Sequence, residues 1–344
     1  MNLLTRINHI LLFVIAASVV VYFGSSFLVP FIFGIFLASL MTPFSNLQER
    51  IGINRFFSSL ISTLVVFIVI GGLLYLFSFQ IRQFLQDLPI LLEKLQGMFK
   101  SLQAGVSRMT GFSMEDQQSL IQKRSEDMIG SVEKQLTGFL GSMIDTVAKF
   151  LLMLIYVFLM LLYRDRFKRF IMMYIDSEKK EEAEEVTGKI SKVVYQYLWG
   201  RAQVMTLLGI MYYITFVIFG LPFALLLTVF GALITIIPYV GPFIATVIPI
   251  MFAIIYLQEA YQIVLFVIII SIVQLIESYV LEPLIIGKEV KLNPLIVIIA
   301  ILIGSMAWGL AGMILFVPIF AIIKIIANHT EGLHPVGYLF SNKK

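Results

Sequence analysis

The sequence has no cysteine and few charged residues. Without cysteine there is no disulfide bridge, no thiolate metal site and no cysteine nucleophile. Charged residues make up 13% of the 344 residues, against about 25% in a soluble domain, whose surface must face water. Hydrophobic residues make up 59%. The 25 basic and 21 acidic residues cannot cover a soluble protein of this length, so the composition excludes a soluble enzyme and a disordered chain and indicates an integral membrane protein.

Catalytic and metal-binding motifs are also missing. The sequence has no His-Glu-x-x-His zinc motif, no Gly-x-Ser-x-Gly nucleophile elbow and no Walker phosphate-binding loop. Its three histidines, His9, His329 and His334, lie far apart along the chain, so we expect no metal site and no cofactor. Basic residues scattered among apolar segments argue against a nucleic-acid partner. We therefore expect a protein that is not an enzyme and that lies in the lipid bilayer. Without a nucleotide site, any transport by such a protein is driven by a gradient or runs downhill.

Residues 1–79 predict three membrane helices. The runs 10–29, 31–44 and 56–79 are apolar, and a spanning helix needs about 20 such residues. No small-residue cleavage site follows the first run, and Pro30 leads straight into the second. We therefore expect a retained helix rather than a signal peptide, with the junction between the first two helices at Pro30.

Residues 80–145 change to an amphipathic pattern that predicts a helical insert outside the membrane. Apolar residues recur there at alternating spacings of four and three, which is the seam of a narrow helical contact. The seam consists of Ile81, Leu85, Leu88, Leu92, Leu95, Phe99 and Leu102. It fits either a helix packed against its own chain or a subunit contact in a homo-oligomer.

Residues 146–200 predict a further membrane helix followed by a charged cytoplasmic linker. The helix ends in a charged cluster between Arg164 and Arg169, and short basic flanks stay on the cytoplasmic side. Counting spans outward from this cluster places the N-terminus inside and the insert outside. The same count places residues 329–344 in a cytoplasmic tail.

Residues 201–328 contain two apolar segments that are too long for one helix. The segment 222–256 is interrupted by two prolines and a glycine, and the segment 294–326 by several glycines. We expect each segment to form a hairpin of broken helices with these residues at the tips: Pro238, Gly241, Pro242, Gly304, Trp308, Gly309 and Gly312. Further helix breaks are predicted at Pro283, Gly287, Asn293, Pro294 and Pro318.

The number of crossings gives the two hairpins opposite orientations. Each hairpin returns to the side from which it entered, so the first starts outside and the second inside. Discontinuous helices in inverted repeats are the architecture of secondary transporters, whose substrates bind near the midplane. The predicted fold is therefore all-α, with about eight membrane segments and two broken-helix hairpins in an inverted repeat.

Four polar residues of this region are candidates for the transport path: Gln274, Glu277, Glu282 and Lys324. Gln274 and Glu277 are three residues apart and share one helical face. A carboxylate inside a membrane is unfavourable unless it is paired or hydrated, so Glu277 and Glu282 are candidate coupling groups. Alternatively, they are solvated at headgroup level. Lys324 either pairs with one of them or extends to the interface, and Arg201 is expected to anchor its helix on the inside.

The second half of the chain resembles the AI-2E family of bacterial permeases, which is named for an autoinducer-2 exporter. The matching patterns are Ile-Pro-x-x-Gly at 237–241, Gln-x-x-Glu at 274–277, Leu-x-Pro-x-x-x-Gly at 281–287, Leu-x-Pro at 292–294, and a C-terminal pattern of Gly309, Gly312, Val317, Pro318 and Lys324. The resemblance covers nearly the whole chain. Where members often have Gly-Asn after the glutamate, this chain has Ser278 and Tyr279.

The resemblance implies a homo-oligomeric, multi-pass protein of the bacterial inner membrane that exports a signal molecule or exchanges sodium or lithium for protons. We expect a gradient-driven secondary transporter in which Glu277 or Glu282 carries the coupled proton. Export of a small polar solute is favoured over cation–proton antiport. A non-transporting membrane scaffold built on the insert, and a channel, are the alternatives.

Overall fold

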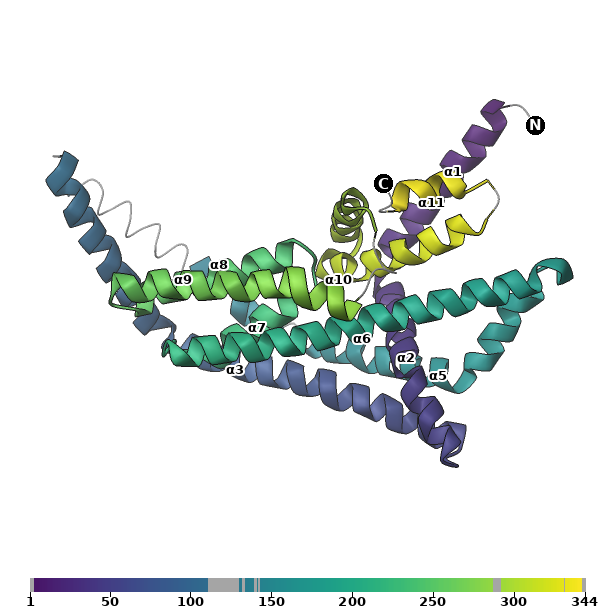
Figure 1. Cartoon of the computed structure of the whole chain (residues 1–344), viewed down its shortest axis with the longest axis horizontal. Coiled ribbons are helices and arrows are strands. Elements are labelled where there is room, and N and C mark those ends of the chain that lie inside the picture. The colour runs from purple at the N-terminus through teal and green to yellow at the C-terminus, as the bar shows by residue number, and fades with distance from the viewer. Residues whose placement is uncertain are drawn as a thin grey trace.

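The computed structural model describes residues 3–110, 130–131, 134–138, 141, 143–286, 292–330 and 332–341. The helices of these residues (Figure 1) are α1 (Leu3–Phe23), α2 (Ser25–Arg50), α3 (Arg55–Thr110), α5 (Met143–Met173), η1 (Ser177–Lys179), α6 (Lys180–Ile218), α7 (Ala224–Ile234), α8 (Val240–Tyr256), α9 (Ala260–Ile276), η2 (Glu277–Ile286), α10 (Pro294–Asn328) and α11 (His334–Phe340). Within the described ranges, six helical segments are long and apolar enough to cross a membrane, and α1, α7 and α8 contribute shorter apolar ones. The prediction of an all-α polytopic membrane protein is confirmed.

Large apolar side chains cover the outside of these helices. Ile68 of α3, Ile218 of α6 and Leu302 of α10 have exposed fractions of 67%, 74% and 59%. In water, so much exposed apolar surface would be unfavourable, but lipid tails are as apolar as these side chains. The surface therefore suits a bilayer.

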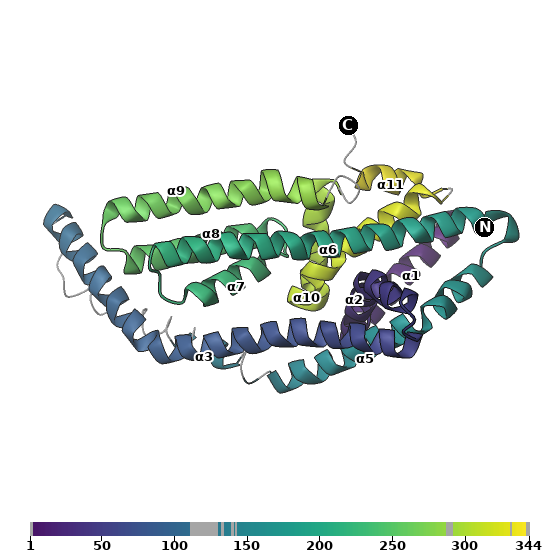
Figure 2. The same cartoon turned by 60° about the horizontal axis from the view of Figure 1, so that its bottom comes forward.

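Helices α2, α3 and α5 pack into an N-terminal bundle, seen in the lower part of Figure 2. The buried core of this bundle consists of Ala38, Val66, Leu154, Val157 and Leu161. The predicted junction at Pro30 is wrong, because the break lies at Gly24 and Pro30 is buried inside α2. A proline removes one backbone hydrogen bond from a helix, and the packing of α2 in the bundle compensates for that loss.

Helix α3 continues without interruption from the membrane unit into the predicted insert. In the seam, Ile81 and Leu88 are buried, and between them Phe84 contacts the rings of Phe223 and Phe252. The first part of the seam therefore packs against its own chain, near α7 and α8. The side chains of Leu92, Leu95, Phe99 and Leu102 lie outside the described residues.

Helix α6 is the central element of the C-terminal core, and α9 runs beside it in both views (Figures 1 and 2). Leu208, Tyr212 and Phe216 are four residues apart, so they lie on one face of α6. All three are fully buried and pack in one cluster with Phe266 and Ile270 of α9. Because α6 is continuous from Lys180, it joins the predicted cytoplasmic linker directly to the core.

The first predicted hairpin consists of α7 and α8, and the chain turns at residues 235–239. At the turn, Tyr239 has a φ of 63°, which is a strained conformation for a residue other than glycine. Gly241 packs so closely on the end of α7 that an added Cβ would lie 2.1 Å from the carbonyl oxygen of Ile234. The chain therefore breaks slightly before the predicted position: Pro238 lies in the turn, whereas Gly241 and Pro242 lie in the first turn of α8.

The second predicted hairpin is α10, which folds back on itself. Trp308 and Gly309 have non-helical backbone angles and form the turn. Gly304 and Gly312 meet across it, and a Cβ added to Gly312 would lie 1.8 Å from the carbonyl oxygen of Gly304. Glycine is required at both positions because the two backbones touch. The predicted second tip is confirmed.

The predicted helix breaks at Pro283 and Pro318 are wrong. Pro318 is buried inside the second arm of α10, which continues to Asn328. Pro283 lies inside η2, a π-helix in which the backbone hydrogen bonds are re-paired over a wider turn, so helical structure continues past the proline. At Pro318, tertiary packing outweighs the single hydrogen bond that the proline removes.

The predicted break at Asn293 and Pro294 is confirmed. Pro294 is the first residue of α10, a position that needs no backbone donor. The side-chain oxygen of Asn293 accepts a hydrogen bond of 3.0 Å from the backbone N–H of Leu295 and caps the helix. Gly287 lies outside the described residues. In the predicted tail, α11 packs against α10, with the rings of Phe340 and Phe320 stacked.

Candidate functional site

The site is built around η2, the π-helix that continues α9. A π-helix joins residues five apart by backbone hydrogen bonds, and such turns are rare and frequent at functional sites. Glu277 and Glu282 are five residues apart and bracket one such turn, so their carboxylates approach the same neighbour. In an ordinary α-helix, residues at this spacing point in different directions.

That neighbour is Arg201 of α6. The Nη1 atom of Arg201 donates a hydrogen bond to Oε1 of Glu282 and lies 3.7 Å from Oε1 of Glu277. The exposed fraction of the side chain is 5% for Arg201 and 1% for Glu277, against 40% for Glu282. Burying the arginine and the first glutamate is tolerable only because they face each other, since each charge alone would lose its hydration.

Two hydrogen bonds orient Glu277, and side chains of α6 and α8 support one of their donors. The Nε2 atom of Gln274 donates to Oε2 of Glu277 at 2.8 Å, and the hydroxyl of Ser278 donates to the same oxygen at 3.0 Å. The amide oxygen of Gln274 in turn accepts hydrogen bonds from Tyr212 of α6 at 2.8 Å and from Thr246 of α8 at 3.4 Å. The prediction that Gln274 and Glu277 share a face agrees with this contact.

The network is incomplete. In the described residues, Nε and Nη2 of Arg201 and Oε1 of Glu277 are buried without a hydrogen-bond partner. Two donors and one acceptor are thus held close together in a place where an unpaired polar atom is unfavourable. Such a group of atoms can bind a polar ligand or re-pair when the helices move.

A cavity of about 570 Å³ adjoins the network on one side. Arg201, Glu277, Ser278 and Glu282 line it, together with the tip of the first hairpin at Pro238, Tyr239 and Pro242. Val297 and Val317, from the two arms of α10, close the other wall. We call this space the polar cavity.

A second cavity of about 780 Å³ lies between the N-terminal bundle and the core. Its lining is mostly apolar and comes from α2, α3, α5, α6 and α10, with Ile236 from the turn of the first hairpin. The tip of the second hairpin lines it through Ala307, Trp308 and Ala311. Tyr197 and Arg201 line this apolar cavity and the polar cavity alike, so these two side chains separate the two spaces.

The structure brings together three of the four predicted path residues, namely Gln274, Glu277 and Glu282. The fourth, Lys324, is half-buried on the second arm of α10. The partner of both glutamates is Arg201, which the sequence reading treated as an anchor. Tyr197 and Tyr212 were also missed. One signal was available for Arg201: it is a lone charge at the start of an apolar run, on the same predicted side as the glutamates.

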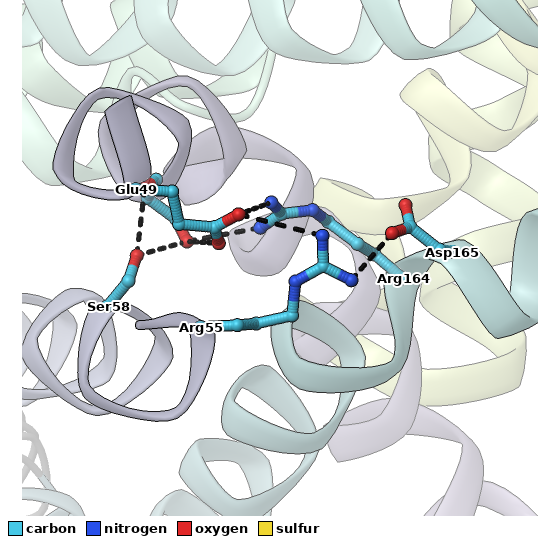
Figure 3. A network of polar contacts seen from close by, with 6 residues as sticks. Glu49, Arg55, Ser58, Arg164 and Asp165 are labelled. Carbon is cyan, nitrogen blue, oxygen red and sulfur yellow. Dashed lines mark hydrogen bonds and ion pairs between the residues drawn. The ribbon is translucent and has the colours of Figure 1, made fainter. Parts of the chain in front are cut away.

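A second charged cluster joins the ends of α2, α3 and α5 (Figure 3). Glu49 lies between Arg164 and Arg55, with carboxylate–guanidinium distances of 2.7 and 3.5 Å, and Arg55 reaches Asp165 at 2.6 Å. Ser45 and Ser58 are joined by their hydroxyls at 2.7 Å, and Arg164 donates to Ser45. We call these six residues the bundle cluster. It joins three helices and lines neither of the two cavities.

Among the residues that the structure describes, no group of three histidine, aspartate or glutamate side chains is arranged to hold a metal ion.

Comparison with known proteins finds relatives that match most of the sequence. The family model described as "AI-2E family transporter" matches residues 11–332. YrrI of Bacillus subtilis, named as a candidate transport protein, is 25% identical over 88% of this chain and 86% of its own length. The AI-2 transport protein TqsA of Escherichia coli is 22% identical over 93% of this chain and 91% of its own. With a match that spans both hairpins, η2 and the helix that carries Arg201, this chain belongs to the AI-2E transporter family.

Proposed function

We propose that the protein is a gradient-driven secondary transporter that exports a small polar solute, such as autoinducer-2, across a bacterial inner membrane. Membership in the AI-2E family supports transport as the activity. The name of TqsA, an AI-2 transport protein, supports a solute of that kind. On this proposal, the N- and C-termini are cytoplasmic and the protein works as a homo-oligomer in the lipid bilayer.

The proposal depends mainly on the position of Arg201 between two cavities. The first hairpin tip lines the polar cavity through Pro238 and Tyr239, and the second lines the apolar cavity through Trp308, which Ile236 of the first turn also reaches. Tyr197 and Arg201 line both cavities. A transporter that opens to one side at a time needs a binding residue that both sides can reach, and a movable element that closes each approach. The guanidinium of Arg201 meets the first need, and the tips at Tyr239 and Trp308 are placed to meet the second.

The predicted topology assigns a side of the membrane to each cavity. Basic residues between Arg164 and Arg169 mark the cytoplasmic end of α5. The first hairpin then enters from outside and the second from inside, as an inverted repeat. On this topology we propose that the apolar cavity, which Ser26 of α2 and Thr146 of α5 line, opens to the outside and that the polar cavity opens to the cytoplasm.

The charges of the site supply a coupling mechanism. When a proton neutralises Glu277 or Glu282, its attraction to Arg201 is lost, and the guanidinium is free to pair with the solute or to move toward the apolar cavity. Release of the proton on the other side restores the pair. The unpaired Oε1 of Glu277 is suited to accept a hydrogen bond from a hydroxyl group of a small polar solute.

Proteoliposomes test the proposal. The purified protein is reconstituted, a proton gradient is imposed, and the fluxes of autoinducer-2 and of sodium are followed side by side. We expect gradient-dependent movement of autoinducer-2 that is lost in Glu277→Gln and retained in Asp165→Asn, a matched change in the bundle cluster. Flux that is the same with and without the gradient would contradict gradient-driven transport.

Cation–proton antiport is the second candidate. The carboxylates of Glu277 and Glu282 lie beside the buried guanidinium of Arg201, and a sodium ion could take the place of this guanidinium. In the same vesicles, sodium-dependent proton movement without movement of autoinducer-2 would favour it. A non-transporting scaffold is the remaining alternative. Gly241→Leu, which forces a side chain against the end of α7, should stop a transporter and leave a scaffold built on the insert intact.

A further inference from the structure

The lining of the apolar cavity consists mostly of hydrocarbon side chains. Val29, Phe33, Leu74, Phe150 and Met205 are among the side chains that face it. Its volume of about 780 Å³ lies within the range of small-molecule sites, about 300–1,000 Å³. Such sites are mostly apolar and carry a small number of polar groups that fix the ligand's orientation. The cavity therefore favours a ligand with a large apolar body.

Arg201 provides the orienting group. It is 4% exposed, and its Nη1 atom is engaged with Glu282 and Glu277. Its Nε and Nη2 atoms are buried without a partner. These two N–H groups lie on one edge of the planar guanidinium and point the same way, which is the geometry that binds both oxygens of a carboxylate. One edge of the arginine is thus occupied and the adjoining edge is available.

We propose that the apolar cavity binds a single-chain alkyl carboxylate, with its headgroup on the Nε–Nη2 edge of Arg201 and its chain between the N-terminal bundle and the core. Burial of the chain supplies affinity, because apolar surface leaves water or the headgroup region. The charge-assisted pair of hydrogen bonds supplies selectivity for an anion. Lys149, an exposed cation that also lines this cavity, favours the entry of anions.

This ligand is different from the solute proposed for the polar cavity, and the two sites share Arg201. A carboxylate on the free edge of the guanidinium adds a negative charge beside Glu277 and Glu282 and weakens their hold on the arginine. The cavity is thereby a point at which an amphiphilic anion from the membrane influences the transport site.

The fluorescence of Trp308 can report ligand binding in the apolar cavity. It has two tryptophans, of which Trp308 lines the apolar cavity and Trp199 is 47% exposed. In a Trp199→Phe background, the fluorescence of Trp308 is measured in detergent micelles while dibrominated stearate is added. The methyl ester of the same acid and a brominated alkyl trimethylammonium serve as matched probes. No gradient is present, so the result does not depend on whether the protein transports.

We expect saturable quenching by the carboxylate and only gradual, non-saturable quenching by the ester and the cation. Arg201→Gln should weaken carboxylate binding by about tenfold or more, since a hydrogen-bonded charge pair is lost. Arg164→Gln, in the bundle cluster, should leave it unchanged. Ala311→Phe fills the cavity without changing its charge and should abolish saturable quenching.

Several results would overturn the proposal. Equal quenching by acid and ester would mean that the cavity takes up lipid without recognising the anion. Undiminished binding in Arg201→Gln would remove the guanidinium from the site. A shift of the thermal transition or of the tryptophan emission maximum in Arg201→Gln would mean that this variant changes the fold. Ala311→Phe then tests whether the carboxylate occupies the apolar cavity. Saturable quenching that persists in Ala311→Phe would place the ligand elsewhere.

Discussion

The bundle cluster and the Arg201 site use the same kinds of residue in opposite ways. In the bundle cluster, the charged side chains have exposed fractions of 18–49%, and none of the six residues has a buried polar atom without a partner. At the Arg201 site, a guanidinium and a carboxylate are 5% and 1% exposed, and three of their polar atoms are unpaired. A hydrated, complete network fixes helix ends. A dry, incomplete network is a place for a ligand or for movement.

Neutralising the buried pair should have the largest effect on function. Arg201→Gln leaves the carboxylate of Glu277 buried without a cation, and removal of one partner of a buried pair is unfavourable by about 3–5 kcal/mol. We expect transport in proteoliposomes to be abolished. Arg201→Gln combined with Glu277→Gln should recover much of the lost thermal stability without recovering transport, because the one carboxylate left without its partner, that of Glu282, is 40% exposed and hydrated. Normal flux in the double variant would show that the pair is dispensable.

Forcing apart the two arms of the second hairpin should have the second-largest effect. In Gly312→Val, the new Cβ would lie well inside contact distance of the Gly304 carbonyl oxygen, and overpacking of this kind is unfavourable by about 3 kcal/mol. A lowered thermal midpoint and loss of transport are expected. Gly72→Ala on α3 is the control, since nothing lies within 4 Å of its added Cβ. Similar midpoints for the two variants would contradict the close approach of the arms.

Removing the hydroxyl of Tyr212 should have a moderate effect. Tyr212→Phe deletes the donor to Gln274 and leaves the buried ring in place, so the expected loss of stability is about 1 kcal/mol. Because Gln274 orients Glu277, transport should fall several-fold while the protein stays folded. A flux equal to that of the unmodified protein would mean that Glu277 holds its position without this support.

Breaking the bundle cluster should have the smallest effect. Asp165→Asn removes one exposed ion pair with Arg55, and such pairs contribute about 0–1 kcal/mol and are screened by salt. We expect transport to be unchanged and the small loss of stability to disappear at high ionic strength. If Asp165→Asn impairs transport as strongly as Glu277→Gln does, the distinction between the two clusters fails.

The sequence predicts those parts of the fold and site that depend on local rules. Apolar runs identify the long helices, and the cluster of prolines and glycines at 238–242 and the glycines near Gly309 locate both turns. The spacing of Gln274 and Glu277 places them on one face. These features follow from helical periodicity and from the backbone limits of proline and glycine.

The features that sequence reasoning missed depend on tertiary contacts. The buried residues Pro30 and Pro318 remain inside helices because packing outweighs one lost hydrogen bond, and Pro283 remains inside one because the π-helix re-pairs the backbone. The π-helix brings Glu282 to the same arginine as Glu277, and no single-helix pattern indicates that widening. Arg201 is 76 residues from Glu277 along the chain, so only the packing of α6 on η2 reveals the pair.

The most direct test of the account is the side from which each cavity can be reached. Since the chain has no cysteine, the single variants Ser26→Cys, in the apolar cavity, and Ser278→Cys, in the polar cavity, can be labelled with a membrane-impermeant maleimide in oriented membranes. The account predicts that Ser26→Cys reacts from outside and Ser278→Cys from the cytoplasmic side. Labelling of both positions from the same side would contradict the placement of Arg201 between two opposed openings.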